Sequence, residues 1–118
     1  MMPADVPAAS TPASTEAAAT ACMASLVRSL ADNKAALGRR YAEWAVSAPT
    51  LESAVAAAAM AQDELGHARA TYPVLKALGV EVADDDTHLD GDRRLALLDD
   101  ELPDWTAFIA ANLLVDGV

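Results

Sequence analysis

The stretch AAAAMAQDELGHARATYP, residues 56–73, decides the fold, because a helix-forming run carries a glutamate and a histidine on one face. Alanine at this density favours helix, and its small side chain lets two helix backbones approach closely. A helix repeats every ~3.6 residues, so Glu64 and His67 lie one turn apart on the same side. Small or apolar residues occupy the neighbouring positions of that side, which predicts that it packs against another helix.

Two long runs share this spacing, and each predicts one long helix with a single packing stripe. Residues 16–46 form the first run, and its stripe consists of Met23, Val27, Leu30, Lys34, Leu37, Tyr41 and Trp44. The second run begins at residue 49 or 51 and ends at Leu78, with Gly79 as its C-cap. Its stripe consists of Ser53, Ala57, Met60, Glu64, His67, Thr71, Val74 and Leu78.

The two helices are expected to pack antiparallel, because Pro49 breaks the chain and leaves a turn of only a few residues. A turn centred near residues 48–49 sets the register. In that register Lys34 faces Glu64, and Leu30 faces His67. Three ionisable side chains are therefore predicted at one level of an otherwise apolar interface.

Other charged residues of the first helix are expected to stay outside this level. Glu43 would lie ~15 Å along the axis from Glu64. Asp32 and Asn33 come close in sequence, but the register places them off the stripe.

The pattern of residues after Gly79 predicts an acidic connector, a short helix and one further long helix. An acidic connector follows Gly79, and residues 93–102 are expected to form a short helix. A third helix is expected to open at Pro103, with Trp105, Ile109, Asn112 and Asp116 on one stripe. Pro73 should kink the second helix or split off its last turn. No β pattern is present, so the fold class is all-α.

The two ends of the chain carry separate expectations. Residues 1–15 are rich in Pro, Ala, Ser and Thr and predict a flexible tail, which leaves residues 16–118 as the single helical domain. The apolar helical pattern is still open at residue 118, which favours a truncated chain or a bundle completed by a second copy.

Composition excludes several classes of function. The net charge of −10 and the pI of about 4.3 argue against nucleic acid or an anionic membrane as a partner. Cys22 is the only cysteine, so an internal disulfide or a cysteine-based zinc site is excluded. No uncharged run is long enough to span a membrane, and a cytoplasmic location is expected.

The Glu-x-x-His pair suggests a metal site, because carboxylate-bridged di-iron bundles use this pair on two of their helices. Carboxylate and imidazole ligands suit iron or manganese. The alternative is structural: His67 could be a core histidine, and Glu64 the ion-pair partner of Lys34. A buried carboxylate needs a counter-charge in either case.

Four segments of the chain resemble the phenylacetic acid catabolic proteins, the ferritin-like A- and C-type subunits of ring-1,2-phenylacetyl-CoA epoxidase. These segments are LADNKAALGRRYAEW, SAPTLE, AQDELGHAR and NLLVDGV, and the resemblance covers residues 30–118. The first two are closer to the C-type subunit, and the last two to the A-type subunit. The resemblance implies a ferritin-like bundle, here incomplete, with a long-helix hairpin and the start of a third helix.

The resemblance also implies a role in phenylacetate catabolism, within a monooxygenase that inserts one oxygen atom of O2 into the ring of a CoA thioester. The A-type subunit holds the di-iron centre, and the C-type subunit is its structural partner. Carried over by position, Glu64 and His67 match the second-helix ligand pair, and Asp116 matches an acidic position of the third helix. These three residues are the candidate metal ligands.

One departure from the catalytic pattern decides the preferred interpretation. Where a catalytic subunit would carry a glutamate opposite Glu64, this chain has Lys34. An ammonium favours the carboxylate form but repels iron, so Lys34 is predicted to replace the metal as counter-charge. The chain is then a C-type structural subunit without catalytic residues or a cofactor of its own, and it meets the CoA substrate only within the complex. Its partner is the A-type subunit or a second copy.

Two alternatives remain open at this point. A divergent catalytic subunit would bind iron through Glu64, His67 and Asp116 together with ligands from other helices. A non-catalytic helical interaction protein would carry the Glu-x-x-His pair by chance.

Overall fold

A computed structural model describes residues 11–82, 96–98 and 101–116, and of Asp116 only the backbone. Two long helices, α1 (Pro12–Ala45) and α2 (Leu51–Ala77), form an antiparallel hairpin. A single 3-10 turn, η2 (Ala96–Leu98), and a shorter helix, α3 (Trp105–Asp116), follow. The described residues contain helices and no strand, which confirms the all-α prediction.

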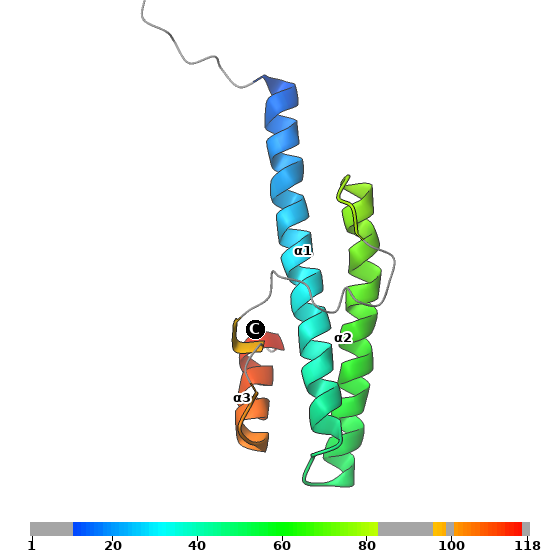
Figure 1. Ribbon diagram of the computed structural model, residues 1–118, viewed down its shortest axis with the longest axis vertical. Coiled ribbons are helices and arrows are strands. Elements are labelled where there is room, and N and C mark those ends of the chain that lie inside the picture. The colour runs from blue at the N-terminus through cyan, green and yellow to red at the C-terminus, as the bar shows by residue number, and fades with distance from the viewer. Residues whose placement is uncertain (1–10, 83–95, 99–100, 117–118) are drawn as a thin grey trace, which may run out of the picture.

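Figure 1 shows how these elements are arranged. The N-terminal part of α1 extends past the end of α2, and α3 lies beside the other half of α1, running antiparallel to it. Each helix begins with a side-chain cap, because Thr11, Thr50 and Asp104 accept hydrogen bonds from backbone N–H groups three residues later. Gly79 follows the end of α2 with φ of +80°, the left-handed conformation of a C-terminal glycine cap.

Small residues form the contact between α1 and α2. We call this contact the small-residue seam; its buried members are Ala31, Ala35 and Gly38 of α1 and Ala57, Ala61 and Ala68 of α2. Their spacing of three, four or seven keeps them on one side of each helix. At Gly38 the approach is closest, since a Cβ placed there would lie 2.8 Å from Leu65 Cγ and 3.2 Å from the backbone nitrogen of Leu65.

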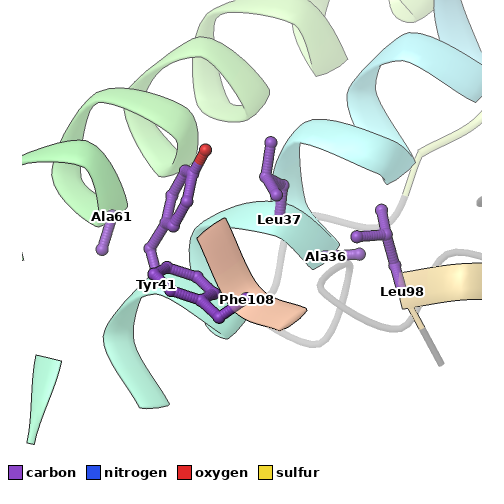
Figure 2. Close-up of a cluster of buried hydrophobic side chains, with 6 residues drawn as sticks. All are labelled: Ala36, Leu37, Tyr41, Ala61, Leu98 and Phe108. Atoms are coloured by element: carbon purple, nitrogen blue, oxygen red, sulfur yellow. The ribbon is translucent and has the colours of Figure 1, made fainter. Parts of the chain in front are cut away.

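The main hydrophobic cluster lies where α1 meets both α3 and α2, since it includes Ala61 of α2. Tyr41 is fully buried, and Phe108 meets it edge to face with 5.5 Å between ring centroids. Trp44 stacks on Phe108 at 5.6 Å and also contacts Trp105. Figure 2 shows this cluster, in which Leu98 of η2 lies next to Ala36. Aromatic pairs of this kind stabilise beyond the area that they bury.

The predicted stripe of α1 therefore faces α2 only in part: Lys34 meets Glu64, and Leu37 and Tyr41 lie in one cluster with Ala61. Its members Leu37, Tyr41 and Trp44 pack in the cluster with Phe108, whereas Met23 and Leu30 are each 52 % exposed. Beside this stripe, small residues also face α2, and Gly38 permits the closest approach of the two helices.

Several other boundaries differ from the predictions. α1 begins at Pro12 rather than near residue 16, while residues 1–10 of the predicted tail lie outside the described part. α2 continues through Pro73 to Ala77, so its last turn is not split off. Of the short helix predicted at residues 93–102, the described residues include the turn η2, while residues 93–95 and 99–100 lie outside the described part. Ile109 is 45 % exposed, and Phe108 takes the inward position instead.

Candidate functional site

The candidate site is built around Glu64, which the small-residue seam of α2 carries into the interface. Glu64 is 4 % exposed, and its Oε2 lies 2.8 Å from Nζ of Lys34 on α1. The two groups form a salt bridge between the two helices. The predicted meeting of Lys34 and Glu64 is confirmed.

His67 completes the predicted group, but it lies at the edge of the site. Its Nδ1 is 3.5 Å from the other oxygen of Glu64, Oε1, and its side chain is 63 % exposed. The spacing of three residues on α2 sets this geometry. Glu64 therefore lies between a lysine from the facing helix and an imidazole from its own helix. Glu43, as expected, stays away from them; it is exposed and pairs with Arg40.

A second polar pair crosses the same interface and was missed by the sequence analysis. Asp32, which was expected off the packing surface, is only 2 % exposed, and the hydroxyl of Tyr72 donates a hydrogen bond to its Oδ1 over 2.7 Å. Burial, together with the hydrogen bond and charge of Asp32, raises the pKa of Tyr72, and the positive charges of Arg28 and Arg39 oppose this shift. The sequence carried one signal for it: Asp32 lies between Ala31 and Ala35, within the run of small residues.

The comparison with known proteins agrees with this architecture. Residues 5–118 match the family model of the phenylacetic acid catabolic protein, which is nearly the whole chain. The chain belongs to this family. It is accordingly a protein of phenylacetate catabolism, and the resemblance predicted from the sequence is confirmed. The match does not separate A-type from C-type subunits. No curated protein and no solved structure matches the chain.

Family membership raises the question of whether the side chains fit a di-iron centre, and those that the structure describes do not. A di-iron bundle needs several carboxylates and histidines around one point. No described Asp, Glu, His or Cys joins Glu64 and His67 in a group of three that could hold a metal. The ammonium of Lys34 stands against the carboxylate where a cation would bind. Asp116 ends α3, but its side chain lies outside the described part, so its predicted role as a ligand stays a prediction.

None of the described helices combines the length and the apolar character that a membrane-crossing segment requires.

Proposed function

We propose that this member of the family is a structural, C-type subunit of an oxygenase that epoxidises the aromatic ring of phenylacetyl-CoA. The chain would support the di-iron subunit of the complex without carrying out the oxygen chemistry itself. The observation that carries this proposal is the contact of 2.8 Å between Lys34 Nζ and the buried Glu64 Oε2.

The physical argument concerns what neutralises Glu64. A buried carboxylate needs a positive neighbour, because its transfer from water costs several kcal/mol. Lys34 supplies that charge from the facing helix, and its side chain is itself only 25 % exposed. A metal ion in the same place would meet a like charge at short range, which weakens binding of the metal. The lysine thus maintains the bundle in the position where a catalytic subunit would hold iron.

Reconstitution tests the proposed role. The chain is purified alone and also co-expressed with the A-type subunit, and each preparation is supplied with the reductase and phenylacetyl-CoA. We expect a stable complex with the A-type subunit, and substrate-dependent oxygen consumption only when that subunit is present. Oxygen consumption coupled to ring epoxidation by this chain with the reductase alone would overturn the proposal. The cytoplasmic location belongs to the same proposal and is checked by fractionation.

A catalytic role is the second candidate, and the pairing of Glu64 with His67 favours it. The two side chains approach to 3.5 Å on one turn of α2, as the ligand pair of a di-iron bundle would. In that case the remaining ligands, Asp116 among them, would come from other helices, and Lys34 would have to swing away. The metal content of the protein separates the two candidates.

A further inference from the structure

The small-residue seam between α1 and α2 does little to fix how the two helices slide on one another. Its members are alanine or glycine at spacings of three, four or seven on both helices. A slide by one turn would place small residues opposite small residues again, with similar packing. Specific registers are usually set by interlocking large side chains or by buried polar groups, and the interface holds a contact of each kind: Leu65 against Gly38, and Tyr72 with Asp32.

The short turn between the helices sets the approximate register and brings Lys34 to Glu64, but it does not fix every contact along the interface. A turn centred near residues 48–49 predicts that Gly38 lies opposite residue 59 or 60 of α2. In the structure Gly38 touches Leu65, further along α2 than the turn alone would place the contact. Side-chain contacts therefore refine the register that the turn sets.

Two polar contacts lie on different flanks of the seam, and their α2 partners, Glu64 and Tyr72, are eight residues or about 12 Å apart along that helix. Asp32 and Lys34 are two residues apart on α1, so their side chains point in nearly opposite directions around the helix. Asp32 accepts the hydroxyl hydrogen of Tyr72 on one flank, and Lys34 reaches Glu64 on the other. Asp32 is the more deeply buried of the two α1 residues, at 2 % exposure.

We propose that the Asp32–Tyr72 hydrogen bond is the register lock of the hairpin, and that it holds α1 where Lys34 meets Glu64. A slide or rotation of either helix would separate the hydroxyl from the carboxylate and leave Asp32 buried without this donor, which penalises the alternative registers. The alanine seam supplies close packing, and the polar pair selects one arrangement of it. This inference holds whichever type of subunit the chain is.

Distance measurement between spin labels tests the lock in the full chain. One label is attached to the native, exposed Cys22 of α1, and the other to an Ala70→Cys substitution at an exposed site of α2. Labelled protein is diluted with unlabelled protein, so that only distances within one chain contribute. We expect one narrow distance for the otherwise wild-type chain. The double variant Asp32→Leu/Tyr72→Phe should add a second population, displaced by about 5 Å, the rise of one helical turn.

Two matched variants separate a lock from general stability. Thr71→Ala removes a hydroxyl that bonds only to the His67 carbonyl within α2, over 2.6 Å, and should keep the single distance. Asp32→Asn retains an oxygen that accepts a hydrogen bond from Tyr72, so this variant should also keep the single distance. A single narrow distance in the double variant would overturn the proposal. If the double variant unfolds, Tyr72→Phe alone decides in the same way: a second population supports the lock, and an unchanged distance contradicts it.

Discussion

At the scale of single residues, two buried carboxylates of this chain are stabilised by different kinds of partner. Glu64 meets the ammonium of Lys34 at 2.8 Å, and Asp32 accepts a hydrogen bond of 2.7 Å from Tyr72. Each partner comes from the facing helix, so each carboxylate depends on the hairpin being closed. Polar groups at such depth favour one arrangement and penalise the others.

Removal of the lysine should destabilise the hairpin. Lys34→Ala leaves the buried Glu64 without its lysine partner. Breaking a buried ion pair costs roughly 3–5 kcal/mol, and we expect a loss near the lower end of this range because Lys34 is partly exposed. The loss of helix in urea, followed by circular dichroism, should shift to lower denaturant. The double variant Lys34→Met/Glu64→Leu should recover most of the loss, because neither charge is then stranded. An equal loss in both variants would show that the pair is not the cause.

The Tyr72–Asp32 pair predicts a dependence of stability on alkaline pH. Burial and Asp32 raise the pKa of Tyr72 above its ordinary value of about 10, so the fold favours the neutral phenol. This contribution is complete below about pH 10 and is lost as the pH rises further, because the unfolded chain then releases the proton more readily than the native protein. Urea unfolding should show stability that falls above pH 10 in the wild type and falls less steeply in Tyr72→Phe. Identical pH dependence of stability in the wild type and in Tyr72→Phe would contradict this prediction.

At the scale of the elements, the hairpin depends on how closely α1 and α2 approach. The approach is limited by Gly38, where even a Cβ would meet the side chain and backbone of Leu65. Helix propensity alone would favour alanine at this position. The close contact with Leu65 therefore explains why a glycine is present.

A pair of glycine substitutions tests this approach. Gly38→Ala should lower the unfolding midpoint, because its Cβ would lie 2.8 Å from Leu65 Cγ and forces the helices apart. Gly66→Ala is the matched control in α2, where a Cβ meets nothing within 4 Å. It should stabilise the helix by about 0.5–1 kcal/mol. The account of the seam fails if Gly38→Ala is as stable as Gly66→Ala.

The sequence predicted the elements better than it predicted their faces. Hydrophobic spacing and caps located three helices, and the turn at Pro49 brought Lys34 to Glu64 as the structure confirms. The faces were predicted only in part, because α1 carries a small stripe beside the large one, and spacing alone does not say how the two divide between α2 and α3. Asp32 and Tyr72 are forty residues apart, so only the three-dimensional register could reveal their contact.

At the scale of the whole molecule, large apolar side chains stay exposed on the described part. They occur on all three α-helices, and those of α1 and α3 include Met23, Leu26, Leu30, Leu113 and Leu114. Large exposed apolar area of this kind usually marks a site of protein–protein contact.

The isolated chain should therefore associate or lose fixed packing. In light scattering coupled to size exclusion we expect residues 1–118 to be dimeric or larger, or else to bind a hydrophobic dye with a weak near-ultraviolet dichroism signal. A monomer that binds no dye and unfolds cooperatively would contradict this expectation.

The iron content of the purified chain tests the central claim most directly, because Lys34 and a metal compete for the same carboxylate. Metal analysis after expression in iron-supplemented medium should find little iron in the wild type. Lys34→Glu should raise the content if other helices supply ligands, whereas Lys34→Gln, the matched control, should not. About two iron ions per wild-type chain, the complement of a di-iron site, would contradict the structural role if Glu64→Ala or His67→Ala removes them.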